Sequence, residues 1–544
     1  MVQVILGRVG SALVALVAGW LWLFTASANA ATITLYGTQT NQIIDGFGAN
    51  INSWAWNTNE ARPLMDALID EAGMTIFRVV LQNGWETTND NTNPAIMNWA
   101  YYNAIYSTPA FERLWDFMAY LNQKGITDGL MLNPQGIGPA WLGGQTLTAG
   151  KEDEWAEMVA SLLVYARGNR HLQFTQVAPN NEPDYGEQGI VISSAAQYVT
   201  TLRKLAQLLD TNGLSDLRLI GPDRATGNTA WMPEMLNDPV VMAKLAHFGV
   251  HSYSGAGSGS IGVYNLINGS AYPDRRFWVT EFNMWCASCI GTNGNDANSW
   301  AYSRGTAQYL FDHLAIGASA GIVWEGFDSY YPHDGFWDFF GLFHVNNTNA
   351  TPLTFTRRKN FYTLAQVTKF VRPGAQRINL GGSTSPFTLL AFYHRDRGQF
   401  TLTGINPSGA TALTGTLTSL PTIPSLEFYY TSSTTNLAHT ATVPVSNGVF
   451  SLTIPGDSVF TLTGFDPAKI SAALAITAST NAASNSITLS WPAAATGFAL
   501  ETTTNLTLPG IWSPVTNIPQ LLSNQQCIFL NPTGQSVFFR LHRP

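Results

Sequence analysis

The feature that most limits the folds open to this chain is an alternation of strand-like and helix-like segments. From about residue 43 to residue 370, short apolar or β-prone runs alternate with stretches whose apolar residues recur at helical spacing. The segments 152–167 and 195–210 are clear amphipathic helices, and Ser193 or Ser194 can cap the second. This alternation predicts an α/β fold, and its eight units fit a (β/α)8 TIM barrel. The expected strands are Ile43–Asn50, Thr75–Leu81, Gly129–Asn133, Gln173–Ala178, Leu217–Gly221, His247–Ser252, Phe277–Glu281 and Gly321–Glu325.

Polar and aromatic residues gather at the carboxyl ends of these strands, where a barrel of this type keeps its chemistry. In chain order the expected strands end near Asn50, Gln82, Asn133, Glu182, Asp223, Tyr253 and Glu281, and the eighth carries Trp324 and Glu325.

Glu182 and Glu281 are lone carboxylates that lie 99 positions apart. One βα unit averages about thirty residues, so the gap corresponds to three units. If Glu182 ends the fourth strand, Glu281 ends the seventh, and both face the same mouth. Two carboxylates across a cleft can cleave a glycosidic bond, one by protonating the leaving oxygen and the other by attacking or by activating water. The pair therefore indicates a glycoside hydrolase.

Arg78 lies inside the apolar run Ile76–Val80, where an unpaired charge would be costly. We expect Glu281 to be its partner. An arginine there would keep Glu281 ionised as a nucleophile, while the less paired Glu182 would have a raised pKa and serve as the acid. The alternative is an ion pair that only supports the barrel.

Further residues are expected to bind substrate. Asn181 can hydrogen-bond the sugar 2-hydroxyl, although an Asn-Glu-Pro sequence also suits a simple turn. Tyr253 can donate to the nucleophilic carboxylate, and His251 either lines the same pocket or is a core residue. Trp324 is the strongest candidate for stacking on a sugar ring. Weaker candidates for the floor and walls of the site are Trp54, Trp85, Trp141 and Trp285.

No cofactor or metal is expected. The glycine pattern at 257–262 resembles a dinucleotide motif, but it follows a barrel strand in a Gly- and Ser-rich run, which favours a rim loop. Cys286 and Cys289 could be half of a zinc site, but no second cysteine pair completes it. A small disulfide is therefore expected there, with Cys527 free.

The amino terminus has the pattern of a secretion signal. Residues 1–30 contain one charge, Arg8, followed by the apolar run Ser11–Phe24 and the small-residue sequence Ala28-Asn29-Ala30. We expect cleavage near Ala30 and a secreted, monomeric protein, with an uncleaved anchor as the alternative. Loss of Arg8 leaves 26 basic residues against 35 acidic ones, a net charge of −9. Without a basic stripe, nucleic acid and anionic membranes are poor partners, and neither is expected to bind. The 17 tryptophans favour a carbohydrate partner.

After Phe370 the chain becomes rich in Thr, Ser and Gly, with short strands that predict a β-sandwich over 371–466. Its clearest strands are 388–393, 399–405, 426–431 and 459–464. Residues 470–544 are expected to form a fibronectin-like β module. A spacer or attachment role is favoured for it over sugar binding, because it has no clear cluster of aromatic residues.

Taken together, these motifs resemble glycoside hydrolase clan A, and within it family 30. The clan resemblance rests on Arg78, Asn181-Glu182, His251-x-Tyr253, Glu281 and Trp324 in this order. The family resemblance rests on Ile44–Ala49, Pro139–Trp141, Trp278–Glu281 and Val371–Ile378, within about residues 33–465. It implies Glu182 as acid/base, Glu281 as nucleophile, a barrel over 31–370, and a first strand at about 31–37 that joins the sandwich.

Two departures affect the expected substrate. Asn133–Trp141 is one residue longer than the family pattern and lacks its first tryptophan, and the loop Asp328–Phe343 has no arginine pattern for reading glucuronate. That loop is instead rich in aromatic and acidic residues: Tyr330, Tyr331, His333, Asp334, Trp337 and Asp338. The resemblance implies a retaining enzyme acting internally on xylan, β-1,6-glucan or β-1,6-galactan. The alternatives are an exo-acting β-glycosidase on small substrates, an inverting hydrolase and a non-catalytic carbohydrate-binding protein.

Overall fold

The structure is a computed structural model. It describes residues 30–52, 61–186, 188–255, 258–290, 295–328, 339–345, 354–469, 475–481, 484–493, 495, 498–504, 512–522, 525–531 and 537–542.

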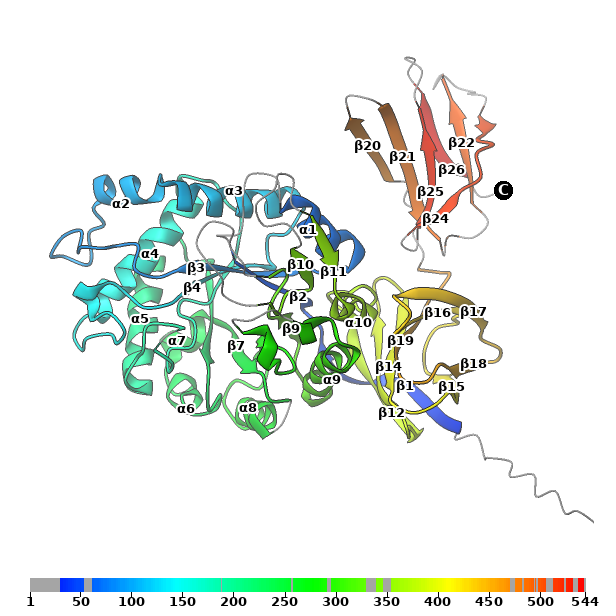
Figure 1. The fold of residues 1–544 in the computed structure, drawn as a ribbon, viewed down its shortest axis with the longest axis horizontal. Coiled ribbons are helices and arrows are strands. Elements are labelled where there is room, and N and C mark those ends of the chain that lie inside the picture. Colours follow the sequence, from blue (N-terminus) through cyan, green and yellow to red (C-terminus); the bar gives the residue numbers. More distant parts are fainter. Residues whose placement is uncertain are drawn as a thin grey trace, which may run out of the picture.

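Eight parallel strands close into a barrel in chain order, which confirms the predicted fold class (Figure 1). Each expected strand is present, with ends shifted by a few residues. The largest change is at β5, which shortens from the expected Gln173–Ala178 to Gln176–Val177. The barrel strands are β2 (Gly46–Asn52), β3 (Ile76–Gln82), β4 (Leu130–Gln135), β5 (Gln176–Val177), β6 (Arg218–Arg224), β7 (Leu245–Ser252), β8 (Arg276–Phe282) and β9 (Ala320–Val323).

Amphipathic helices surround the barrel and bury their apolar faces against it. Ser194 caps α5 through its side chain, which accepts a hydrogen bond from the Gln197 N–H. The principal helices are α2 (Trp99–Tyr106), α3 (Pro109–Gln123), α4 (Glu152–Gly168), α5 (Ala195–Thr211), α8 (Ser258–Asn268), α9 (Trp300–Ile316) and α10 (Lys359–Thr368). Short helices are α1 (Arg62–Asp66), η2 (Ala67–Glu71), η3 (Ala140–Leu142), α6 (Met232–Leu236), α7 (Pro239–Lys244), η4 (Ala287–Cys289) and η5 (Asn295–Asn298).

Side chains fill the barrel interior in layers. An apolar cluster lies within it, and at its base Trp278 stacks on His247 and donates a hydrogen bond to Asp45. This cluster contains Ile76, Met131, Ala178, Ile220, Trp278, Ala320 and Ile322. A fully buried polar layer includes Asn50, Arg78, Asn133, Asp223 and Thr280. Because the polar layer lies within a closed, packed barrel, its hydrogen bonds can hold functional side chains rigidly.

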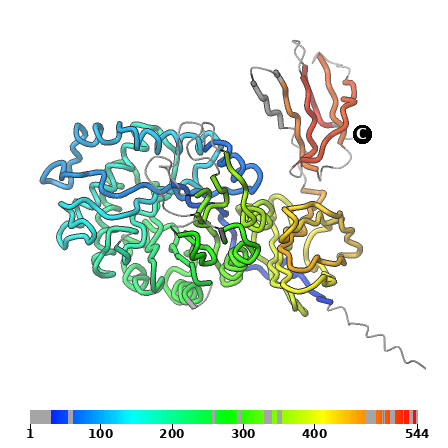
Figure 2. The backbone as a smooth tube through the Cα atoms, viewed as in Figure 1, coloured from blue at the N-terminus to red at the C-terminus, as the bar shows by residue number. Residues whose placement is uncertain are grey.

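A nine-stranded sheet forms the second domain, in the order β17-β16-β19-β14-β13-β12-β1-β15-β18. The amino-terminal strand β1 (Ala30–Ile43) lies within it, antiparallel to β12 and parallel to β15. Figure 2 shows this blue strand among the yellow strands of the sandwich. The other strands are β12 (Gln376–Ser383), β13 (Thr388–His394), β14 (Gln399–Asn406), β15 (Thr411–Thr418), β16 (Ser425–Ser432), β17 (Ala438–Pro444), β18 (Val449–Ile454) and β19 (Ser458–Phe465), and β10 (Phe343–Val345) pairs with β11 (Phe355–Arg357) beside the barrel.

The carboxyl-terminal region forms a separate β module of two small sheets, ordered β20-β21-β25-β24 and β23-β22-β26 (Figure 1). Cys527 is free and buried there. Its strands are β20 (Ala475–Asn481), β21 (Ser484–Pro492), β22 (Ala499–Thr503), β23 (Ser513–Pro514), β24 (Gln520–Leu522), β25 (Gln525–Leu530) and β26 (Phe538–His542). Among the helices in the described residues, none is both long and apolar enough to cross a membrane.

Candidate active site

Arg78 is the centre of the buried polar layer. It points inward from β3 with no exposed surface, and its guanidinium donates to four oxygen atoms. Nη1 lies 2.6 Å from Glu281 Oε1 and 2.9 Å from Asn50 Oδ1. Nη2 lies 2.6 Å from Asn181 Oδ1 and 3.2 Å from Asp223 Oδ2. The expected pairing with Glu281 is present, and it is one part of a larger network that holds a buried cation.

Glu281 receives hydrogen bonds at both carboxylate oxygens. Arg78 donates to Oε1, and the Tyr253 hydroxyl donates to Oε2 at 2.6 Å. The residue lies on β8, where its register partner on β7 is His251. Two donors on one buried carboxylate fix its orientation.

Glu182 approaches the mouth from the loop after β5. Its φ of 35° lies in the left-handed region, which is uncommon for residues other than glycine. The Glu182 N–H donates to the Asp223 carbonyl at 3.0 Å, and the Asn181 N–H donates to the Pro134 carbonyl at 3.0 Å. These long-range bonds hold the strained backbone in place and direct the side chain toward Glu281.

Burial raises the pKa of Glu182, and the nearby carboxylates of Glu281 and Asp184 add to this effect. A hydrogen bond with His251 and the positive charge of that imidazole act in the opposite direction but do not reverse it. Burial lowers the pKa of His251, but Glu281, Glu182 and Asp223 outweigh burial and raise it overall. The His251–Glu182 pair can therefore retain a proton that exposed groups of these types would release.

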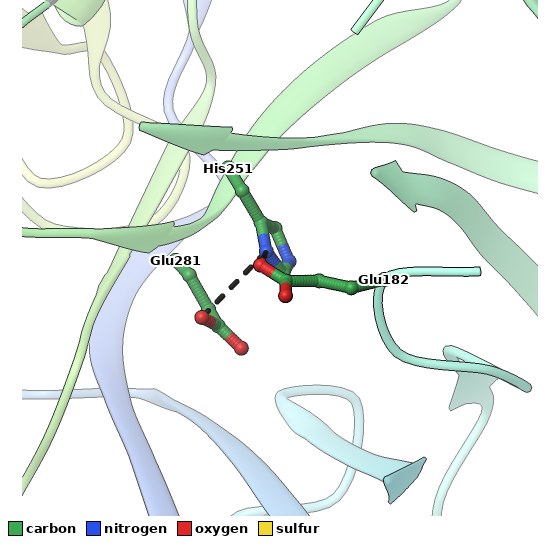
Figure 3. Close-up of side chains that lie close together, drawn as sticks. All are labelled: Glu182, His251 and Glu281. Atoms are coloured by element: carbon green, nitrogen blue, oxygen red, sulfur yellow. Dashed lines mark hydrogen bonds and ion pairs between the residues drawn. The ribbon is translucent and has the colours of Figure 1, made fainter. Parts of the chain in front are cut away.

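Figure 3 shows the side chains of Glu182, His251 and Glu281 converging from three separate segments. His251 Nδ1 lies 2.9 Å from Glu182 Oε1 and 3.6 Å from Glu281 Oε2. One possible ligand atom from each of the three residues lies within 4.8 Å of the other two, a spacing that could hold a metal ion. A cation at this point would lie close to the positive charge of Arg78 and would compete with Arg78 for the carboxylate of Glu281. The arrangement therefore fits acid/base and nucleophilic chemistry better than metal binding.

A cleft of about 380 Å³ opens above the two glutamates. Of the tryptophans expected at the site, Trp324 and Trp285 line it; Trp324 is buried and Trp285 is 54% exposed. The described lining residues are Gln135, Asn181, Glu182, Tyr185, Gln188, Ala225, Thr226, Tyr253, Glu281, Trp285, Ile290, Trp324 and Phe340.

Other expected wall residues lie elsewhere. Trp141 is not among the lining residues: its Nε1 donates to the Glu86 carbonyl at 2.6 Å, and its ring faces the Lys151 ammonium. Trp85 lines a second hollow, which the loop after β3 shares with residues of α2 and α3. Trp54, Trp337 and the other aromatic and acidic residues of 329–338 lie outside the described residues.

A disulfide joins Cys286 and Cys289, with their Cα atoms 5.3 Å apart. It closes the short helix η4 directly after Trp285, whose ring lies 6.4 Å from that of Tyr253 and 6.3 Å from that of Phe340, measured between ring centroids. The covalent link restricts the backbone next to this tryptophan on the cleft wall.

Sequence reasoning left several site residues without a role. From the sequence, Asn50 and Asp223 are expected only as strand ends, yet both accept hydrogen bonds from Arg78, and Asp223 also accepts one from Thr280 at 2.6 Å. Their signal was present, since each is a polar residue at the carboxyl end of a barrel strand. Four lining residues, Tyr185, Gln188, Thr226 and Ile290, come from loops that carry no recognisable pattern.

The chain is similar to several known proteins, all at low sequence identity. No family model matches the chain. The glucuronoxylanase XynC of Bacillus subtilis (strain 168) is 20% identical over 443 residues, which cover 79% of this chain and 91% of that protein.

Solved structures share the fold. The glycoside hydrolase family 30 subfamily 8 xylanase Xyn30A from Clostridium acetobutylicum has a TM-score of 0.62 at 19% identity, covering 80% of this chain and 99% of that chain. The endo-β-1,6-glucanase BT3312 has a TM-score of 0.59 at 17% identity, and the match covers 80% of this chain and 95% of that chain. These findings confirm the resemblance to glycoside hydrolase clan A and family 30, and they support a glycoside hydrolase.

Proposed function

We propose that this protein is a secreted, retaining β-glycoside hydrolase that cuts internal bonds of a β-linked polysaccharide. Glu281 acts as the nucleophile and Glu182 as the acid/base. The observation that carries the proposal is the pair of buried carboxylates at one cleft, held in different environments. Glu281 has two donors, Arg78 and Tyr253, whereas Glu182 has a raised pKa.

In the first step, Glu182 gives its proton to the glycosidic oxygen while Glu281 Oε2 or Oε1 attacks the anomeric carbon. The bond to the leaving sugar breaks and a covalent glycosyl–Glu281 ester forms. Glu182, now ionised, takes a proton from water, and the resulting hydroxide equivalent displaces Glu281. Asn181, held by Arg78, is placed beside Glu182 to hydrogen-bond the sugar hydroxyl next to the reacting carbon.

The distance between the carboxylates supports retention over inversion. Retaining pairs lie about 5–5.5 Å apart, whereas inverting pairs need about 6.5–9.5 Å to admit a water molecule. An oxygen of Glu182 lies within 4.8 Å of an oxygen of Glu281.

The lining of the cleft favours an uncharged polysaccharide as the substrate. Xylan, β-1,6-glucan and β-1,6-galactan are the candidates, and the similar proteins include a glucuronoxylanase and an endo-β-1,6-glucanase. Among the described residues that line the cleft, none is an arginine or lysine that could pair with a glucuronate. A neutral polysaccharide is therefore preferred.

The test is to incubate residues 31–544 with xylan, β-1,6-glucan, β-1,6-galactan and β-1,4-glucan. Proton NMR follows the first-formed reducing end, and chromatography follows product length. We expect a β reducing end and mixed oligosaccharides. An initial α product would refute retention, release of monosaccharide alone would refute internal cleavage, and binding without cleavage would favour a non-catalytic carbohydrate-binding protein.

A further inference from the structure

The wall of the cleft beside Glu182 differs in chemistry from the wall beside Glu281. Around Glu281 the described lining side chains are mainly aromatic: Tyr253, Trp285, Trp324 and Phe340. Around Glu182 they are mainly amides and hydroxyls, and Tyr185 is the aromatic residue among them; these residues are Gln135, Tyr185, Gln188 and Thr226.

We infer that Tyr185, with Gln188 and Thr226 beside it, forms the binding site for the leaving sugar. This inference rests on the proposed function, because it takes Glu182 as the group that protonates the leaving oxygen. A leaving sugar must then lie on the Glu182 side of the broken bond. Tyr185 follows Glu182 by three residues, and its N–H donates to the Glu182 carbonyl at 2.8 Å.

Tyr185 is available to a ligand and is firmly placed. Its side chain lines the cleft and the residue is 49% exposed, so a sugar ring can cover apolar surface that otherwise meets water. The Tyr185 carbonyl accepts hydrogen bonds from the Gln188 and Gly189 N–H groups at 3.1 and 3.3 Å. Gly189 lies so close to the Asn181 carbonyl that a Cβ atom there would be 1.6 Å from its oxygen. Close packing of this kind fixes the loop against the catalytic strand end.

The loop is also tied to the neighbouring strand. The Gln188 carbonyl accepts from the Gly136 N–H at 2.9 Å and from Asn181 Nδ2 at 3.1 Å. Gln188 Oε1 accepts from Gln135 Nε2 at 3.4 Å. These bonds leave Gln188 Nε2 able to donate to a sugar hydroxyl.

Asp184 fixes the opposite edge of this site. Its carboxylate accepts hydrogen bonds from the Ala225 and Thr226 N–H groups at 2.8 and 3.0 Å, and from Thr226 Oγ1 at 2.8 Å. Both Ala225 and Thr226 line the cleft. One half-exposed ring between polar groups suits a ligand that combines an apolar face with many hydroxyls, which is a sugar rather than an aryl or alkyl group.

The test separates the leaving group from the rest of the substrate. The variant Tyr185→Ala is assayed on the polysaccharide that the wild type cleaves and on the matching β-glycosyl fluoride. Fluoride leaves without occupying a sugar site. We expect kcat/KM on the polysaccharide to fall about tenfold to a hundredfold, while hydrolysis of the fluoride stays within about twofold of the wild type. The variant Tyr185→Phe keeps the ring and should restore most of the loss. Tyr264→Ala removes a tyrosine that is 44% exposed on α8 and serves as the control.

Transfer to an added sugar gives a second measurement. With the fluoride as donor, wild-type enzyme should pass its glycosyl group to an added oligosaccharide, and Tyr185→Ala should transfer less while hydrolysing normally. Equal losses on both substrates, or no loss on either, would overturn the assignment of Tyr185. A wild type that cleaves neither the polysaccharide nor the fluoride would instead overturn the proposed function.

Discussion

Glu157 offers a quantitative test of the electrostatics outside the cleft. It lies on α4 and is 1% exposed, and its Oε1 has no hydrogen-bond partner among the described residues. Burial, followed by the negative charges of Asp90, Glu86 and Glu154, raises the pKa of Glu157 from 4.5 to about 8. We predict that Glu157→Gln stabilises the protein, and that this gain grows with pH.

The size and direction of the effect follow from proton linkage. An acid whose pKa is higher in the folded state takes up a proton on folding, so its full contribution to stability is present below pH 4.5 and declines as pH rises toward 8. Each pH unit in that window removes about 1.4 kcal/mol from the free energy of unfolding. The amide side chain of glutamine does not titrate. Glu157→Gln should therefore be more stable than the wild type by about 3 kcal/mol at pH 7, and by less than about 1 kcal/mol at pH 5.

Urea denaturation followed by tryptophan fluorescence measures this difference at both pH values. Glu234→Gln, which changes an exposed glutamate on α6, is the matched control and should change stability by less than about 1 kcal/mol, to the same extent at both pH values. A stability difference for Glu157→Gln that is the same at pH 5 and pH 7 would refute the linkage, because a packing effect does not titrate. A destabilised variant at pH 7 would refute it as well.

Three further predictions concern the cleft. Glu281→Gln should abolish turnover while leaving sugar binding intact, as measured by product assay and calorimetry; wild-type hydrolysis would remove Glu281 as nucleophile. Glu182→Ala should slow polysaccharide cleavage far more than cleavage of activated aryl glycosides, and azide should restore the rate on the aryl glycosides. Equal losses on both substrates, without rescue by azide, would point to another residue as the acid. His251 opposes the rise in the pKa of Glu182, so His251→Ala should raise that pKa further. The alkaline limb of the pH profile of kcat/KM should then move to higher pH. An alkaline limb that stays in place or moves to lower pH would contradict this prediction.

Arg78 shows which parts of the site can be predicted from sequence. A charge inside an apolar strand must have a partner, so desolvation cost predicts one for Arg78, and Glu281 at a neighbouring strand end was the candidate. The spacing of Glu182 and Glu281 also predicted a shared mouth, because βα units have a regular length. Both predictions need only the types of residues and their spacing in the sequence.

Asp223 and Trp141 show why the rest required the structure. Asp223 has a φ of 49°, and the β6–β7 register shifts beside it, between Pro222 and Arg224. Since one residue of shift reverses the direction of a side chain, strand position alone could not place Asp223 beneath Arg78. Trp141 follows the third barrel strand as expected, but it lies on the short helix η3, donates a hydrogen bond to the Glu86 carbonyl and is not among the described residues that line the cleft. Contacts between segments that are far apart in the sequence determine where such side chains lie.

The position of β1 has a consequence for how the chain folds. This strand is made before the barrel, yet its partners β12 and β15 are made only after the whole barrel has been synthesised. Until then Ile33 and Leu35, which are buried in the finished sheet, have no partner strand to cover them. A sheet that waits for such a distant segment has high contact order, so we expect its closure to be a late and slow step in folding. A truncation that removed the chain as far as Leu35 would therefore leave the facing edges of β12 and β15 largely unpaired, and would expose the sandwich to association between molecules.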